Sequence, residues 1–249
     1  DHKIQIPGEA VKMGDGKFIG LVSLTTDKPD ALLMARGYLH YFESFNSDRA
    51  LLDSVKYYLD KTAEKNDSYS AVLIHYYYLQ QDYKNIITTS SAFKKLTKLD
   101  AWTAYRVGEA FLNTQSYTEA ATYFQQAVNE EKYNLDYNFK LATAKIFSGK
   151  SEEAENLLQF IVAENPTYHM AWNNLGVLQA GKGNYLEAEK SFTKAIQLDP
   201  DYVLARIKLA ELFIATRQRT KAREAISYLE KYYPELQELP KLTLQLRSI

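Results

Sequence analysis

Residues of fixed size recur along this chain with a period of 34 residues. One column of that period holds only alanine and another only proline: Ala120, Ala154, Ala188 and Ala222; Pro166, Pro200 and Pro234. A fixed period between roughly 20 and 50 residues is the sequence signature of a repeat protein. The period therefore predicts stacked units, each of which buries its apolar face against its neighbours.

Three more columns of the same period combine small residues with large apolar ones. They are Gly108, Ala142, Gly176 and Ala210; Val107, Leu141, Leu175 and Leu209; and Phe124, Leu158, Phe192 and Ile226. The pattern indicates two antiparallel helices per unit, because small residues let neighbouring axes approach and large ones fill the space beside them. The prolines are expected to stop the second helix, since their ring clashes with the preceding turn and they lack an N–H.

The most complete copy runs from residue 169 to residue 202 and contains Trp172, Leu175, Gly176, Ala188, Phe192 and Pro200. This spacing resembles the W-x2-L-G, A-x3-F and P pattern of the tetratricopeptide repeat family. The resemblance implies an all-α fold, a right-handed superhelical solenoid of helix-turn-helix units. It also implies a scaffold that binds a protein or peptide partner and is not an enzyme.

The repeat frame predicts three parts of the chain. Residues 1–28 do not repeat; glycines and a proline break any helix there, and residues 18–22 resemble a short extended run. About six units follow: 29–66, with an atypical sequence and a polar break at 43–48, then 67–100, 101–134, 135–168, 169–202 and 203–236. The unit 67–100 has Ile86 and Ser90 at two helix-packing columns. Residues 237–249 are expected to form a C-terminal cap interrupted at Pro240.

Composition excludes several kinds of function. The net charge of −1 gives no reason to expect nucleic-acid binding, which usually requires a basic face. No apolar run approaches the roughly 18 residues that membrane insertion requires. Cysteine is absent, and His2, His40, His75 and His169 show no metal-ligand spacing, so no cofactor or metal is expected. Because the chain begins with Asp1, we expect it to be processed or excised from a longer protein.

Motifs for catalysis are incomplete. The segment Phe147 to Ser151 ends like a phosphate-binding loop but has Ala144 where that motif needs glycine, and it falls at a turn between two repeat helices. No G-x-S-x-G motif occurs. The sequence therefore favours a binding protein.

The candidate binding surface comes from the family resemblance, in which the first helix of each unit lines a concave groove. The residues that fall at groove positions are His75, Tyr78, Trp102, Tyr105, Arg106, Glu109, Phe139, Lys140, Asn173, Asn174, Lys208 and Glu211. Aromatic, cationic and amide side chains suit an extended peptide, because amides pair with its backbone and cations with carboxylates. In the last unit Leu204 and Ile207 fall at groove positions, so that part is expected to be partly apolar.

One subclass of the family, the chaperone co-factors, holds a C-terminal carboxylate with a clamp of Lys, Arg and Asn. Asn174 and Lys208 match two of its positions, the second as Lys for Arg, but Leu204 stands where the clamp needs Lys. The clamp is therefore not expected in this chain.

Asp1-His2-Lys3-Ile4, followed by Pro7, resembles a segment of bacterial multihaem c-type cytochromes that precedes a tetratricopeptide array. The resemblance implies a second hypothesis, a periplasmic partner-docking module of a larger redox protein, with His2 as a haem ligand. No Cys-x2-Cys-His motif lies in this chain, so the haem domain would precede it. A cytoplasmic location is the alternative.

A third hypothesis is self-assembly. The aromatic pairs Tyr57-Tyr58 and Tyr232-Tyr233 lie near the ends of the predicted array, where they could stack one array on another as a homo-oligomer.

Overall fold

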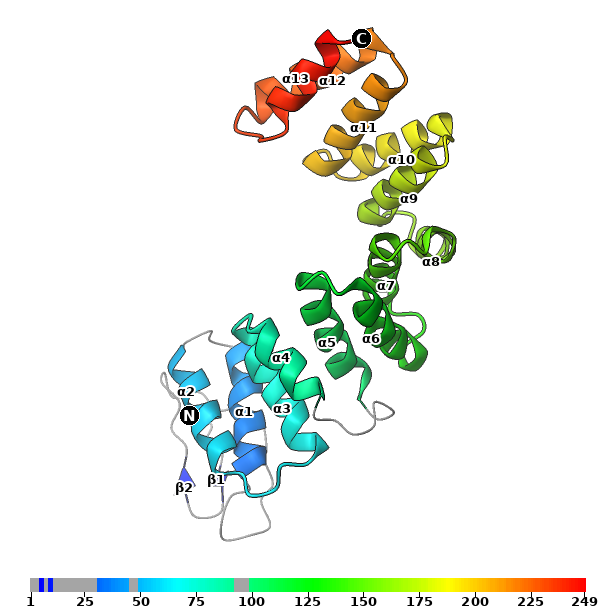
Figure 1. Cartoon of the computed structure of the whole chain (residues 1–249). Coiled ribbons are helices and arrows are strands. Elements are labelled where there is room, and N and C mark those ends of the chain that lie inside the picture. Colours follow the sequence, from blue (N-terminus) through cyan, green and yellow to red (C-terminus); the bar gives the residue numbers. More distant parts are fainter. Residues whose placement is uncertain (1–4, 7–8, 11–30, 45–48, 92–98) are drawn as a thin grey trace. The chain divides into compact units, whose positions relative to one another are not determined.

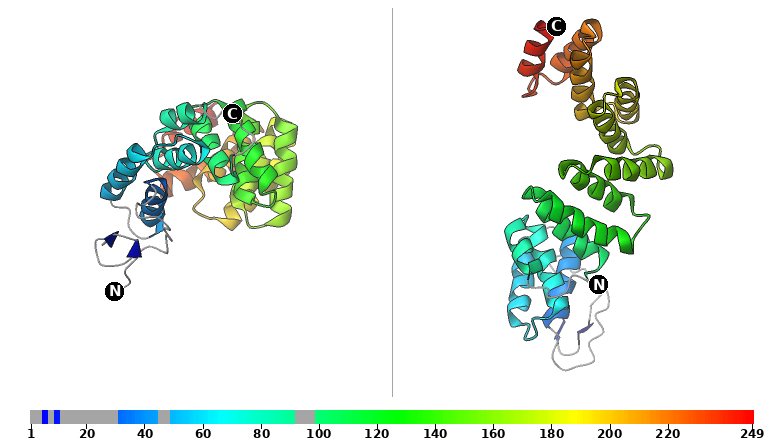
Figure 2. Two further views of the ribbon diagram at one scale, coloured as in Figure 1. Left: turned by 90° about the horizontal axis from the view of Figure 1, so that it is seen from below. Right: turned by 45° about the vertical axis from the view of Figure 1, so that its right-hand side comes forward.

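The structure, a computed structural model, describes residues 5–6, 9–10, 31–44, 49–91 and 99–249. The chain divides into two compact units, residues 1–130 and 131–249. Apart from one pair of two-residue strands, the regular elements of the described residues are α-helices, as the repeat pattern predicts. Figures 1 and 2 show successive helices following one another as hairpins within each unit.

Unit 1 contains the strand pair and six helices in its described part. These are β1 (Gln5–Ile6), β2 (Glu9–Ala10), α1 (Ala31–Ser44), α2 (Arg49–Lys61), α3 (Asp67–Leu79), α4 (Tyr83–Ser91), α5 (Ala101–Asn113) and α6 (Tyr117–Glu130). The strands pair antiparallel with Gln5 opposite Ala10. The sequence pattern does not predict these strands, because strands of this length are too short for a period to appear. The extended run expected at residues 18–22 lies outside the described residues.

Unit 2 contains seven helices, which are α7 (Leu135–Phe147), α8 (Ser151–Glu164), α9 (His169–Gly181), α10 (Tyr185–Leu198), α11 (Val203–Ala215), α12 (Arg219–Tyr232) and α13 (Leu239–Arg247). Helices α8, α10 and α12 each end two residues before a proline of the 34-residue period. The predicted role of these prolines is therefore confirmed.

The core is built from triplets of successive helices. One cluster joins Ala142 of α7 with Leu158 of α8 and Leu175 of α9, and another joins Ala210 of α11 with Ile226 of α12 and Leu242 of α13. In the second cluster α13 takes the place that the first helix of a following repeat has in the first cluster. Each hairpin thus buries its apolar face with the next helix, as stacked repeats require.

Two sequence expectations are wrong in detail. Pro240 does not interrupt a helix, because it lies in the first turn of α13, where no backbone N–H is needed. The polar break expected from residue 43 begins later, since α1 continues through Ser44 and includes Glu43.

The small and large columns meet as predicted. A Cβ atom built on Gly108 would lie 2.7 Å from the Phe124 ring, and one on Gly176 would lie 2.6 Å from the Phe192 ring. All four alanines of the period are fully buried. Close approach of the two helices in these hairpins therefore depends on the missing side chain.

The turns after five first helices share one backbone feature. The residues with positive φ among the described residues recur every 34 positions: Gln81, Gln115, Gly149, Gly183 and Arg217. Left-handed residues of this kind commonly end helices, and glycine adopts the conformation without strain. Three of the five are not glycine, so the turn geometry is set by the repeat packing rather than by residue choice. Gly149 lies in the phosphate-loop-like segment, and its place at a turn between α7 and α8 is as expected.

Candidate functional site

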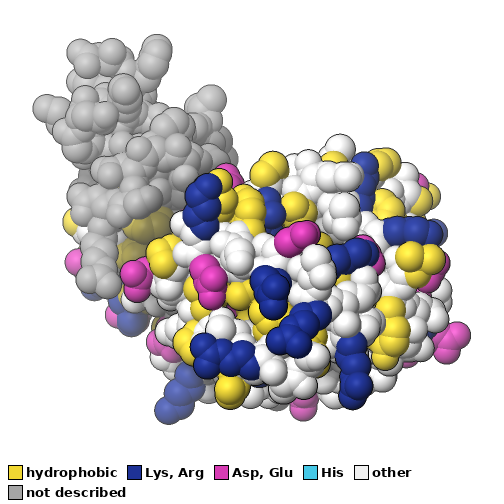
Figure 3. All heavy atoms as spheres, turned by 90° about the horizontal axis from the view of Figure 1, so that it is seen from above, with side chains coloured by type: hydrophobic (Ala, Val, Ile, Leu, Met, Phe, Trp, Pro, Cys, Tyr) yellow, Lys and Arg dark blue, Asp and Glu magenta, His cyan; other side chains and the backbone are white. Residues whose placement is uncertain are grey.

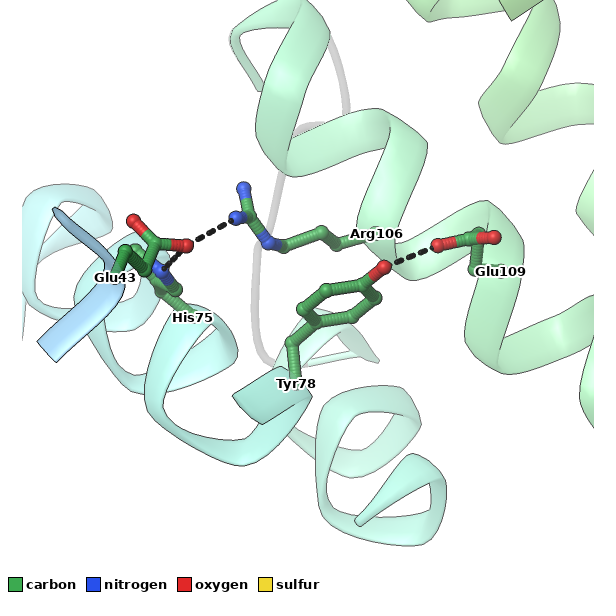
Figure 4. A network of polar contacts seen from close by, with 5 residues as sticks. All are labelled: Glu43, His75, Tyr78, Arg106 and Glu109. Atoms are coloured by element: carbon green, nitrogen blue, oxygen red, sulfur yellow. Dashed lines mark hydrogen bonds and ion pairs between the residues drawn. The ribbon is translucent and has the colours of Figure 1, made fainter. Parts of the chain in front are cut away.

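The most connected candidate residues lie in unit 1, on α3 and α5. Both helices begin at a capping side chain: Asn66 accepts a hydrogen bond from the Tyr69 N–H, and Asp100 accepts one from the Thr103 N–H. The caps fix where each helix starts and therefore which residues share a face. Figure 4 shows the polar contacts that result, to which α1, α3 and α5 all contribute side chains.

Glu43 of α1 is the centre of this cluster. Its Oε1 atom lies 2.7 Å from Nε2 of His75 and 3.1 Å from Nη2 of Arg106. The Glu43 side chain is 35% exposed, whereas that of Arg106 is only 6% exposed. One carboxylate oxygen at the surface thus holds a buried guanidinium and an imidazole together. We call these three residues, with Trp102, the carboxylate cluster.

The electrostatics of the cluster determine the protonation state of His75. Burial and the neighbouring Arg106 cation lower the pKa of His75 to about 4, although Glu43 acts in the opposite direction. His75 is therefore neutral at pH 7. Because a carboxylate only accepts hydrogen bonds, the neutral ring carries its proton on Nε2 and donates it to Glu43.

Aromatic rings surround the Arg106 guanidinium. It packs against the Trp102 ring and lies 4.7 Å from the centre of the Tyr78 ring. Tyr78 in turn donates a hydrogen bond of 2.5 Å to Glu109, and burial followed by that bond raises the pKa of its hydroxyl. Ring faces attract cations, so the buried charge is stabilised by more than its ion pair.

A cavity of about 270 Å³ lies beside this cluster. Helices α1, α3 and α5 contribute to its wall, which includes Arg36, Glu43, His75, Asp100 and Trp102. Trp102 is 36% exposed and meets the His75 ring edge to face at 4.3 Å. The cavity therefore gives solvent access to the carboxylate and to one aromatic ring of the cluster.

The candidate residues of unit 2 lie on α7, α9 and α11. Asn173 is 5% exposed and donates a hydrogen bond of 3.1 Å to Asn174. Its own Oδ1 is buried and has no hydrogen-bond donor among the residues that the structure describes. Lys208 forms an ion pair of 2.8 Å with Glu211, and Phe139 packs against Tyr168.

Some candidates are placed differently from the expectation of a solvent-facing groove. Arg106 is buried within unit 1, and Tyr105 packs on the core residue Phe124. Ile207 is also buried, in the cluster of α11, α12 and α13, so it does not line an apolar groove; Leu204, at 54% exposed, remains accessible. Lys140 is half-buried. Position in the repeat frame therefore identifies the helix face but not the exposure of each side chain.

Glu43 is the functional candidate that the sequence analysis missed. Glu43 belongs to the repeat predicted at residues 29–66, whose atypical sequence does not fit the repeat columns and so gives no groove positions. The spacing between polar partners could have identified it, because Glu43 precedes His75 by 32 residues. The same spacing separates two other pairs, Asp136 and Tyr168, and Glu189 and Lys221. Polar partners in successive repeats thus recur at 32 residues.

The other two hypotheses concern other residues. His2 lies outside the described residues. Of the aromatic pairs, Tyr57 is 57% and Tyr232 54% exposed, while Tyr58 stacks on Tyr38. Within the described part of the chain, no helix is long and apolar enough to span a bilayer. No group of three or more His, Cys, Asp or Glu in that part is placed to hold a metal ion.

Known proteins share the repeat and the fold. The tetratricopeptide repeat family model matches residues 169–202. The mouse protein O-mannosyl-transferase TMTC3 is 29% identical over 159 residues, which are 58% of this chain, and the chain spans only 17% of that protein's length. Its human counterpart is 24% identical over the same share of each.

Two solved structures extend the likeness along the chain. PilF of Pseudomonas aeruginosa has a TM-score of 0.60 at 13% identity, covering 85% of this chain and 97% of its own. YrrB, described as a repeat protein with an unusual peptide-binding site, has a TM-score of 0.54 at 20% identity, covering 86% of this chain and all of its own. Residues 169–202 thus match the tetratricopeptide repeat family, and the chain shares the helical fold of PilF and YrrB.

Proposed function

We propose that this chain is a non-enzymatic scaffold that binds an extended segment of a protein or peptide partner along the first helices of its repeats. The fold supports the proposal, because it is shared with YrrB, a protein described as having a peptide-binding site. We also propose that the six units 29–66, 67–100, 101–134, 135–168, 169–202 and 203–236 make up the array, between a non-repeat segment 1–28 and a cap 237–249.

The observation that carries the proposal is the buried Oδ1 atom of Asn173. A buried polar atom without a partner costs about 1 to 3 kcal/mol, so native proteins rarely keep one without a reason. If the Asn173 side chain turns outwards, a backbone N–H of an extended peptide would satisfy this atom, and the adjacent Asn174 amide offers a second polar contact. An apolar residue at position 173 would avoid the cost if no ligand donated there.

Other residues of the same helices supply apolar and charged contacts. Leu204 on α11 is 54% exposed, and the Lys208–Glu211 pair lies on the same helix. In unit 1 Trp102 is accessible on α5. Each unit therefore offers its own preformed surface, which binds a peptide with little reordering.

The charge distribution favours a peptide over a nucleic acid. Figure 3 shows basic, acidic and hydrophobic side chains interspersed over the face in view. This agrees with the net charge of −1. A nucleic-acid partner usually requires a basic patch.

The test measures, by fluorescence anisotropy, how pools of short peptides with random residues bind to the chain. We expect Asn173→Ala to weaken the binding of the peptides that bind the wild type by about tenfold, since a hydrogen bond to a buried acceptor is lost. The matched control is Asn156→Ala, on the exposed face of α8 in the same unit, which is expected to leave affinity unchanged. Equal binding by Asn173→Ala and wild type would contradict the proposal.

A further inference from the structure

The carboxylate cluster of unit 1 pairs a buried cation with a carboxylate that reaches it from the surface. The Arg106 side chain is 6% exposed, and its pairing with Glu43 brings in a side chain from another repeat, 63 residues earlier in the sequence. A buried guanidinium requires an anionic partner, because removing the partner of a buried ion pair leaves an uncompensated charge and strongly destabilises the fold. The position next to Arg106 and His75 is therefore built for a carboxylate.

Glu43 fills that position but is not locked into it. Its side chain is 35% exposed, so a rotation towards solvent would rehydrate its charge at little cost. The cavity of about 270 Å³ adjoins both Glu43 and His75, which gives a second carboxylate a route to the same atoms. Trp102, on the cavity wall, offers an aromatic surface to the residues that flank an incoming group.

From this arrangement we propose that Glu43 occupies a carboxylate-binding site formed by Arg106 and His75, and that an acidic side chain of the partner peptide displaces it. The proposal rests on the proposed function and adds the chemistry of one subsite: an Asp or Glu of the partner accepts from Arg106 Nη2 and His75 Nε2. Glu43 then acts as an internal competitor that lowers the apparent affinity for acidic partners.

The neutral state of His75 fits this exchange. A neutral imidazole with its proton on Nε2 donates equally to either carboxylate, so the site keeps its hydrogen-bond pattern when the occupant changes. Arg106 keeps one anionic partner before and after. The groups that face the site are Arg36 and Glu43 of α1, His75 of α3, the N-cap residue Asp100, and Arg106 of α5.

The experiment compares two pools of short peptides, one with a central Glu-Glu pair and one with Gln-Gln, on the full chain. Glu43→Gln keeps an acceptor for His75 but removes the competing charge. We expect it to bind the Glu-Glu pool about tenfold more tightly than the wild type does, because the competent fraction of the site rises. The Gln-Gln pool is expected to bind both proteins equally, and adding Arg106→Met is expected to abolish the gain.

A matched control separates the site from general charge. Asp53→Asn removes one negative charge from the exposed face of α2 and is expected to leave binding of both pools unchanged. If Glu43→Gln gains nothing, or gains equally for both pools, the proposal is wrong.

A measurement on the wild-type chain does not depend on any variant folding. The imidazole proton resonances of His75 are expected to shift when the Glu-Glu pool is added and to stay in place with the Gln-Gln pool. No shift at saturation would overturn the carboxylate site. If the pools bind in an Asn173-dependent way but fail these tests, only the carboxylate site fails; if no pool binds, the proposed function fails with it.

Discussion

The hairpins α9–α10 and α3–α4 solve the same packing problem with opposite residues. In α9–α10, Gly176 on the first helix faces the large Phe192 on the second, with Ala188 one turn earlier. At the equivalent positions α3–α4 has the large Ile74 and the small Ser90, with Ile86 in place of the alanine. All three residues of α3–α4 are buried. A large residue thus stands in the place of the glycine, and a small one in the place of the phenylalanine.

The family pattern is therefore one of several ways to fill the space between two helices. Protein interiors require close packing, and the total volume matters more than which helix supplies it. The family model matches residues 169–202, which have the usual arrangement. The α3–α4 hairpin also carries the polar residues His75 and Tyr78 of Figure 4, and the Tyr78 ring lies beside the buried Arg106.

The largest expected effect comes from removing the large residue of either hairpin. Phe192→Ala should lower the free energy of unfolding by about 3 to 5 kcal/mol, and Ile74→Ala by about 2 to 5 kcal/mol, because each leaves a cavity. Chemical denaturation followed by circular dichroism measures both. Leu186→Ala, on the exposed face of α10, serves as a control and should cost less than about 0.5 kcal/mol. A negligible effect of Ile74→Ala would break the comparison.

The next largest expected difference between the two hairpins is in how their stability depends on pH. The pKa of His75 is about 4 in the folded chain and about 6.5 when unfolded, so the unfolded state binds the extra proton as pH falls between these values. Stability is therefore complete above pH 6.5 and falls by up to about 3 kcal/mol as pH drops to 4. His75→Asn should remove this part of the pH dependence, while His169→Asn, whose ring contacts Asp199 and Tyr202, should retain it. Identical pH profiles of the wild type and His75→Asn would contradict the burial of a neutral imidazole.

A smaller effect is expected from adding one methyl group to the glycine column. Gly176→Ala should destabilise by about 1 to 3 kcal/mol, since the new Cβ would lie 2.6 Å from the Phe192 ring. Gly181→Ala in the same helix has no atom within 4 Å of its new Cβ and should be neutral or slightly stabilising. Thermal unfolding of the two variants gives the difference directly. Equal midpoints would mean that Phe192 moves aside freely and that close approach is not required.

The smallest effect concerns the turns. Gln115 has a φ of 61° and Gly183 a φ of 80°, in equivalent turns. Gln115→Gly should stabilise by about 0.5 to 1 kcal/mol by relieving left-handed strain, and Gly183→Ala should destabilise by a similar amount. Denaturation midpoints measure both changes in stability. Changes of the same sign in the two variants would show that backbone strain does not determine the stability of these turns.

The periodic parts of the fold could be predicted from the sequence because packing columns repeat. A helix contact is indicated by Ala188, a close approach of two helices by Gly176, and a helix end by Pro200. Each of these features depends on residues within one hairpin. The helix α13 and the strand pair β1–β2 were less predictable. Pro240 is compatible both with breaking a helix and with starting one, and only packing on α11 and α12 decides between them.

The candidate site was predictable only in part. The repeat frame brought out His75 and Arg106, but not that Arg106 is buried or that Glu43 pairs with both. An ion pair between residues 63 positions apart depends on how three helices meet, which no local pattern encodes. Exposure has the same origin, since Ile207 and Leu204 lie in one helix and differ from 4% to 54% exposed.

Whether the first helices bind a peptide is tested most directly by hydroxyl-radical footprinting of the chain with and without a bound peptide pool. We expect protection of Trp102 on α5 and Leu204 on α11, with no change at Leu186 on α10 or Tyr232 on α12. All four side chains are at least 36% exposed in the free chain, so each can report. Protection of Leu186 and Tyr232 with Trp102 and Leu204 unchanged would place the partner on the second helices and contradict the account.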